Sequence, residues 1–129
     1  MKRFFLVWGP VLVYAVAIFI QSAFPQVVPV KDGWDKVLHF FGFALLGFLA
    51  ARAVFLSGNI GRAAGVVVAA LLAAVWGVMD EFHQSFVPGR TASVGDALAD
   101  TLGAIVGAVL FTYIGVLLYR SNKLYPKGT

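Results

Sequence analysis

Cysteine is missing from this 129-residue chain, and charged residues make up only 12% of it. Without cysteine the chain has neither disulfide bonds nor thiolate metal sites. A soluble domain usually has about 25% charged and about half apolar residues, whereas 60% of this chain is hydrophobic. Because a small domain buries only part of its surface on folding, so much apolar area cannot be hidden from water. The composition therefore excludes a water-soluble fold and predicts a single membrane domain over residues 1–129.

Four long apolar stretches alternate with short polar segments along the chain. A helix that crosses a bilayer needs about 20 mostly apolar residues, and residues 4–24, 34–56, 62–82 and 94–119 meet this requirement. Because the connections are short, neighbouring helices should run antiparallel. We therefore expect an all-α integral membrane bundle of four transmembrane helices. Pro10 should kink the first helix, which is tolerated where a neighbouring group binds the freed carbonyl.

The first apolar stretch follows Met-Lys-Arg, as the apolar core of a signal peptide would. Its apolar run is longer than the roughly 7–15 residues of such a core, and Gln21-Ser22-Ala23 is a poor cleavage site. We therefore interpret this stretch as a retained transmembrane helix, with a signal anchor as the alternative.

Basic residues are unequally distributed between the two ends of the predicted bundle. One end carries seven of the ten, namely Lys2, Arg3, Arg52, Arg62, Arg120, Lys123 and Lys127, and the other carries Lys31, Lys36 and Arg90. Since positive residues favour the cytoplasmic side of a membrane, both termini should lie in the cytoplasm. All six acidic residues and both histidines fall at the opposite end. This distribution predicts a polar site at the outer membrane face.

Three helix ends and one turn bring polar residues to that face. The candidate site residues are Asp35, Lys36, His39, Glu81, Gln84, Arg90, Asp96 and Asp100. Asp96 and Asp100 lie one helical turn apart, on the helix face that also carries Gly103, so they should point into the bundle. His39, Glu81 and Asp100 lie at or inside the helix edges, where an ionisable group is costly unless it is paired or lines a cavity.

The leading interpretation of this site is recognition of an anionic lipid head group. Arg90 can grip a phosphate through two parallel hydrogen bonds, and Lys36 adds a point charge. The turn that precedes Arg90 should bring this residue close to Glu81 and Asp96. The remaining polar residues would then orient the cations or bind sugar hydroxyls.

Other interpretations stay open. If the protein is an enzyme, a hydrolase or transferase acting on a phosphate-bearing lipid, His39 oriented by Asp35 would serve as acid or base, and so would Glu81. The same histidine and carboxylates offer ligands for a divalent metal ion. No compact motif such as H-E-x-x-H is present, so we expect no metal cofactor, with a divalent ion as the alternative. In a structural interpretation the charges only lock the bundle, and Ser93 and Asp96 have capping-box spacing.

Two sequence blocks in this region resemble the VanZ-like family of small integral membrane proteins. The blocks are Asp35-Lys36-x-x-His39 and Glu81-x-x-Gln84-x-Phe86-x-Pro88-Gly89-Arg90-x-x-Ser93-x-x-Asp96, followed by Asp100 and the stretch from Gly103 to Gly107. The resemblance covers residues 34–110, and the second block is long and gapped in a distinctive way. The chain departs from the pattern at Asp100, where many members have Asn.

The resemblance implies a cellular context rather than a reaction. The family takes its name from a protein linked to low-level resistance to teicoplanin, a glycopeptide antibiotic whose target is a lipid-linked cell-wall precursor. A member would be a multi-pass protein of the bacterial inner membrane, in the cell envelope. Membrane lipids and a lipid-linked cell-wall precursor would be its candidate partners.

Two further points concern partners. The basic residues at the helix ends suit anionic lipid headgroups, so nucleic acid is not an expected partner. Small residues recur at every fourth position of the last helix, at Gly95, Ala99, Gly103 and Gly107. This spacing allows helix backbones to approach closely, either within the chain or in a homodimer.

Overall fold

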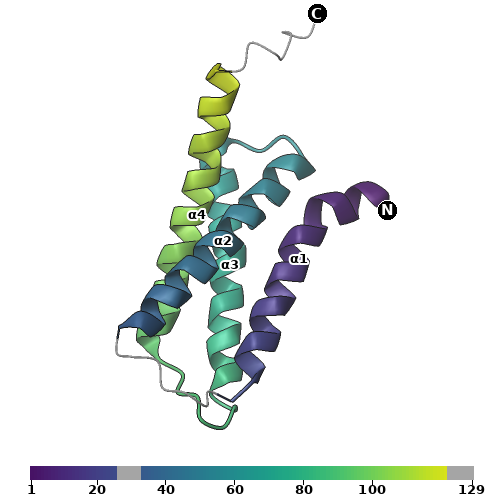
Figure 1. The fold of residues 1–129 in the computed structure, drawn as a ribbon. Helices are drawn as coiled ribbons and strands as arrows, with labels where there is room; N and C mark the ends of the chain where they lie inside the picture. Colours follow the sequence, from purple (N-terminus) through teal and green to yellow (C-terminus); the bar gives the residue numbers. More distant parts are fainter. Residues whose placement is uncertain (26–32, 122–129) are drawn as a thin grey trace, which may run out of the picture.

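The computed structural model describes residues 1–25 and 33–121, with side chains up to residue 115, as four α-helices without a strand (Figure 1). The helices are α1 (Lys2–Ala23), α2 (Trp34–Ser57), α3 (Arg62–Gln84) and α4 (Val94–Ser121). Each is long and apolar enough to cross a membrane. The predicted all-α transmembrane bundle is therefore confirmed, with every boundary within two residues of its predicted position. Three basic residues used to predict the orientation, Lys31, Lys123 and Lys127, lie outside the described residues.

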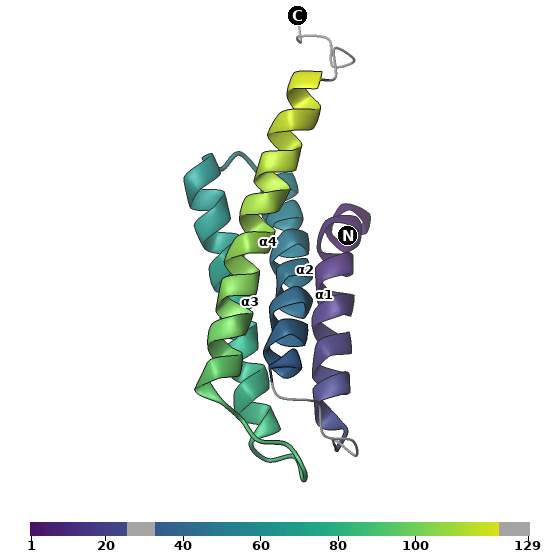
Figure 2. The same cartoon turned by 60° about the vertical axis from the view of Figure 1, so that its left-hand side comes forward.

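Helix α2 holds the bundle together, because it packs against each of the other three helices (Figures 1 and 2). Helix α1 contacts α2 and α3, and within the described part of the chain it has no contact with α4. The N-terminus and the far end of α4 lie toward one end of the bundle (Figure 1). We call the opposite end, where α1 and α3 end and α2 and α4 begin, the polar end.

Small residues allow α2 and α4 to pack with their backbones almost in contact. A methyl group added at Gly103 or Gly107 would overlap a backbone carbonyl oxygen of α2, that of Phe40 or Ala44 respectively. Gly47 on α2 faces the backbone of α4 in the same way. The small residues of the last helix therefore serve packing within the chain, which was one of the two predicted roles; the other was packing in a homodimer.

An arginine from α2 compensates for the proline inside α1. Pro10 has no N–H, so the carbonyl oxygen of Leu6 loses its helical donor. Arg52 Nη1 donates hydrogen bonds to the carbonyl oxygens of Leu6 and Val7 at 3.4 and 3.2 Å. This contact supplies the neighbouring donor that an intramembrane proline requires. Arg52 therefore serves an internal contact between two helices.

The segment between α3 and α4 turns sharply before Arg90. Gly89 adopts a φ of 77°, in the left-handed region that favours glycine. The Arg90 N–H donates a hydrogen bond to the Val87 carbonyl at 3.1 Å and closes the turn. Pro88 and Gly89 occupy the positions that a type II turn prefers for these two residues. The turn therefore sets the direction in which the Arg90 side chain leaves the backbone.

Candidate functional site

Side chains from three helices meet at the buried centre of the polar end. His39 comes from α2, Glu81 from α3 and Asp100 from α4. His39 Nδ1 lies 2.8 Å from Asp100 Oδ1 and 3.6 Å from Glu81 Oε1. The exposed fractions of these side chains are 13%, 8% and 0% for His39, Glu81 and Asp100. We call these three residues the buried triad; the structure thus brings together the three intramembrane ionisable residues singled out from the sequence.

A glycine on α3 makes room for the triad. A Cβ atom at Gly77 would lie 2.9 Å from the Asp100 Cβ and 3.1 Å from the Phe43 ring. Both distances are shorter than normal carbon contacts, so a larger residue at Gly77 would displace Asp100 or the ring. The close approach of α3 and α4 at this point fixes the Asp100 carboxylate beside the imidazole.

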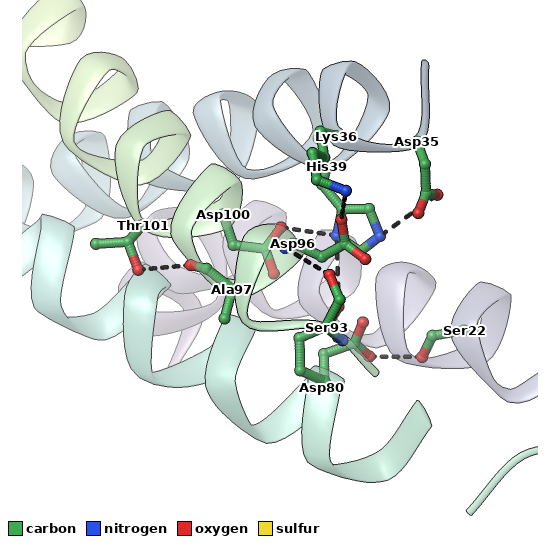
Figure 3. Close-up of polar contacts among 12 residues, drawn as sticks. Ser22, Asp35, Lys36, His39, Asp80, Ser93, Asp96, Ala97, Asp100 and Thr101 are labelled. Atoms are coloured by element: carbon green, nitrogen blue, oxygen red, sulfur yellow. Dashed lines mark hydrogen bonds and ion pairs between the residues drawn. The ribbon is translucent and has the colours of Figure 1, made fainter. Parts of the chain in front are cut away.

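Asp100 is the closer carboxylate partner of His39. The Asp35 Oδ1 atom lies 4.0 Å from His39 Nε2, on the other edge of the ring (Figure 3). The predicted contact of Asp35 with the imidazole is therefore present but long, and the 2.8 Å hydrogen bond of His39 is made to Asp100. The sequence indicated Asp35 through its i, i+4 spacing, but Asp35 is at the first turn of α2 and half-exposed.

The start of α4 is capped by an arrangement that differs from the predicted one. Ser93 Oγ accepts a hydrogen bond from the Asp96 N–H at 3.0 Å, as its N-cap position predicts. The Ser93 N–H donates to Glu81 Oε2 at 3.1 Å, a contact that a capping box would have assigned to Asp96. Asp96 instead forms an ion pair with Lys36, with 3.4 Å between Oδ1 and Nζ. The two groups are not oriented for a hydrogen bond. Asp96 is buried, as predicted.

A second buried polar group joins α1 to α3. Asp80 Oδ1 accepts a hydrogen bond from Ser22 Oγ at 2.5 Å, and Asp80 Oδ2 accepts one from Gln84 Nε2 at 2.8 Å. All three side chains are buried. Gln84 was a predicted site residue, whereas Ser22 and Asp80 were not. The i, i+4 spacing of Asp80 and Gln84 was a usable signal, but nothing in the sequence distinguishes Ser22.

Arg90 lies away from the acids of α4, contrary to the prediction that it neighbours Glu81 and Asp96. Its Nε donates to the Phe24 carbonyl at 3.0 Å and its Nη2 donates to the Gln21 carbonyl at 2.9 Å. The last carbonyl groups of a helix lack intrahelical donors and attract positive charge. The guanidinium therefore caps the C-terminal end of α1, and Lys36 is the cation that pairs with Asp96.

A cavity of about 660 Å³ opens among α1, α2 and α3 at the polar end. Its walls are largely apolar and include Tyr14, Ile18, Leu38 and Phe43. Its polar lining consists of Gln21, Asp35, His39, Asp80, Gln84 and Arg90. Of the triad only His39 lines the cavity, so the imidazole separates this space from the two carboxylates behind it.

Two groups of nitrogen and oxygen atoms in the described residues have a spacing suited to a metal ion. One group is Asp35, His39 and Asp96, and the other is the buried triad. In each group the possible ligand atoms lie within 4.8 Å of one another. Imidazole nitrogen with carboxylate oxygen is a donor set for divalent ions of the first transition row.

Comparison with known proteins identifies the family of the chain. No curated protein and no solved structure matches the chain. Residues 4–119 match the family described as VanZ/LLP1. This range includes all of α2 and α3, nearly all of α1 and α4, and every residue of the polar end discussed above. The chain is therefore a multi-pass membrane protein that belongs to the VanZ/LLP1 family, as the two sequence blocks indicated.

Proposed function

We propose that this protein binds an anionic lipid head group in the cavity at the polar end of the bundle. The observation that carries the proposal is the composition of the cavity lining, with an apolar wall along α1 and α2 and polar side chains at one end. Binding sites for amphipathic ligands have this distribution, because the apolar wall binds hydrocarbon and a few polar groups fix the head.

Arg90 is the phosphate ligand in this proposal. Its Nε and Nη2 atoms are occupied by carbonyl groups of α1, while Nη1 makes no hydrogen bond within the described part of the chain. These carbonyl contacts hold the guanidinium at the cavity edge, which reduces the entropy lost on binding. Lys36 is outside the cavity lining and pairs with Asp96, so we assign the phosphate to Arg90 rather than to both cations.

The acidic lining selects a head group that also carries hydroxyls. Asp35, Asp80 and Gln84 line the cavity together with Arg90. Carboxylates bind sugar or glycerol hydroxyls well but repel a bare phosphate, so Arg90 must face the anion while the acids face hydroxyls. A polyprenyl-phosphate carrier, an envelope glycolipid or a lipid-linked cell-wall precursor has this chemistry. We place the polar end at the outer face of the bacterial inner membrane, because four of the six basic residues whose side chains the structure describes lie toward the other end, namely Lys2, Arg3, Arg52 and Arg62.

The test is lipid binding by the purified full chain in nanodiscs that contain polyprenyl phosphate. We expect Arg90→Ala to weaken binding at least about ten-fold, equivalent to about 1.4 kcal/mol. Ile18→Trp, which fills the cavity from α1, should abolish binding. Arg62→Ala is the matched control, because Arg62 is an exposed arginine at the start of α3. Unchanged binding by both Arg90→Ala and Ile18→Trp overturns the proposal.

A second candidate function is hydrolysis or group transfer on the same class of lipid. His39 favours it, because this imidazole lines the cavity while its Nδ1 atom is hydrogen-bonded to buried Asp100. A carboxylate behind a histidine orients the ring and stabilises its charged form, which suits an acid or base. Turnover of a radiolabelled polyprenyl phosphate, lost in His39→Ala and in Glu81→Gln, would establish this function. Binding without turnover by the wild-type protein would exclude it for that substrate.

A further inference from the structure

The carboxylate oxygens of the buried triad outnumber the hydrogen-bond donors that reach them. His39 offers one donor at Nδ1, and this donor is used by Asp100 Oδ1 at 2.8 Å. Glu81 Oε1 and Asp100 Oδ2 are buried and have no hydrogen-bond partner in the described part of the chain. A buried oxygen without a partner is costly, and more so when it carries charge. One of these oxygens, Glu81 Oε1, lies 3.6 Å from His39 Nδ1, and two buried carboxylates beside a single imidazole N–H call for a further positive group.

Among the side chains that the structure describes, lysine and arginine do not supply this charge. Lys36 is paired with Asp96, and Arg90 donates to the end of α1. Within the described residues, the only ion-pair contacts of Glu81 and Asp100 are with His39. A protonated imidazole carries one charge and still has a single N–H on this edge, so it leaves both orphaned oxygens unpaired.

The distances from His39 Nδ1 to the two carboxylate oxygens are close to those between neighbouring ligands of a small divalent ion. With metal–ligand distances of about 2.1 Å, adjacent ligands lie about 3.0 Å apart in octahedral and about 3.4 Å apart in tetrahedral geometry. The observed separations from His39 Nδ1 are 2.8 Å to Asp100 Oδ1 and 3.6 Å to Glu81 Oε1. Possible ligand atoms of all three residues lie within 4.8 Å of one another, so a modest movement of the carboxylates brings them around one ion.

The carboxylate of Glu81 is oriented in the way that metal ligands usually are. Its Oε2 atom accepts the Ser93 N–H at 3.1 Å, which directs Oε1 toward the imidazole. Outer hydrogen bonds of this kind fix ligand orientation in metal sites. Gly77 fixes Asp100 from the other side, because its missing side chain lets the Asp100 Cβ approach α3.

We infer that His39, Glu81 and Asp100 bind one divalent metal ion of the first transition row, such as Zn²⁺ or Mn²⁺, through Nδ1 and two carboxylate oxygens. The inference revises the sequence-based expectation of no metal cofactor, and it does not rest on the proposed lipid binding. The competing group of Asp35, His39 and Asp96 is less suitable. Asp35 is half-exposed, and Asp96 already has a cation beside it in Lys36.

The experiment uses the full chain, purified in detergent, treated with a chelator and titrated separately with Zn²⁺ and Mn²⁺. Calorimetry gives the affinity, elemental analysis gives the metal content, and thermal unfolding gives the stabilisation by metal. We expect about one ion per chain and a metal-dependent rise in the unfolding temperature. Glu81→Gln and Asp100→Asn should each weaken metal binding at least about ten-fold. Both changes preserve side-chain shape, and Asn retains an oxygen acceptor for His39.

Two control variants separate the triad from its surroundings. Asp35→Asn removes an acid of the competing group, and His83→Ala removes the other histidine, which stacks on Phe19 at 4.3 Å between ring centroids. His83→Ala should bind metal within about two-fold of wild type, and Asp35→Asn should weaken binding less than Glu81→Gln or Asp100→Asn does. The inference is overturned if the wild-type chain binds neither ion at submillimolar concentration. It is also overturned if Asp35→Asn abolishes metal binding while Glu81→Gln and Asp100→Asn do not.

Discussion

Glu81, near the end of α3, accepts a hydrogen bond from the backbone N–H of Ser93, which immediately precedes α4. This contact closes the connection between the two helices. The same carboxylate also takes part in the buried triad, because its other oxygen lies 3.6 Å from His39 Nδ1. Helix capping and the assembly of the buried triad are therefore coupled through a single side chain.

The Ser93 hydroxyl contributes separately, by capping α4. We expect Ser93→Ala to lower the free energy of unfolding by about 1 kcal/mol, because the Asp96 N–H loses its acceptor. Ser93→Gly should cost only a few tenths of that amount, since glycine tolerates the cap position. Reversible unfolding in mixed detergent micelles measures both changes. Equal losses in the two variants would contradict the capping role.

Arg52 should stabilise the protein mainly because α1 contains Pro10. Hydrogen bonds to charged groups contribute about 1.5–3 kcal/mol, and Arg52 donates to the carbonyl oxygens of Leu6 and Val7. We expect Arg52→Met to cost an amount in this range. In a Pro10→Ala background the cost should fall, because Leu6 regains its helical donor. A double-mutant cycle measures this coupling, and additive effects of the two changes would refute it.

Packing of α2 against α4 should tolerate no added methyl groups at the glycine contacts. Gly107→Ala places a methyl group against the Ala44 carbonyl, so we expect a loss of about 1–3 kcal/mol from the overpacked contact. Gly115→Ala is the matched control, since a Cβ atom there meets nothing within 4 Å. Unfolding of the two variants is compared in the same detergent. Equal free energies of unfolding for Gly107→Ala and Gly115→Ala would contradict the prediction, because α2 and α4 would then accommodate the methyl group without loss of stability.

Ser22 should contribute to the stability of the protein, although it is a single hydroxyl in an apolar helix. Ser22→Ala removes one of the two hydrogen bonds that Asp80 accepts, and we expect a loss of about 1–3 kcal/mol. In an Asp80→Asn background the same change should cost less, because the acceptor is no longer a carboxylate. Ser85→Ala is the control, since the Ser85 hydroxyl only contacts its own helix at Phe82 and is exposed. A Ser22→Ala variant as stable as this control would exclude the role.

The sequence predicted the features that depend on local pattern. Helix boundaries follow from apolar length, and the burial of Asp96 and Asp100 follows from their spacing on one helix face. The contacts of Arg90 could not be obtained in this way, because they depend on where the end of α1 lies relative to a turn more than 60 residues away. The same reason applies to Ser22 and Asp80, which meet only after α1 packs against α3.

The cavity and the buried triad at the polar end are completed at different stages of synthesis, because of the order of the helices along the chain. Every residue of the cavity lining lies at or before Arg90, so the lining is complete in the growing chain before α4 is synthesised. The third member of the buried triad, Asp100, arrives only with α4. Insertion of the last helix is therefore the step that completes the buried triad, because only then does the Asp100 carboxylate come to lie beside the His39 imidazole.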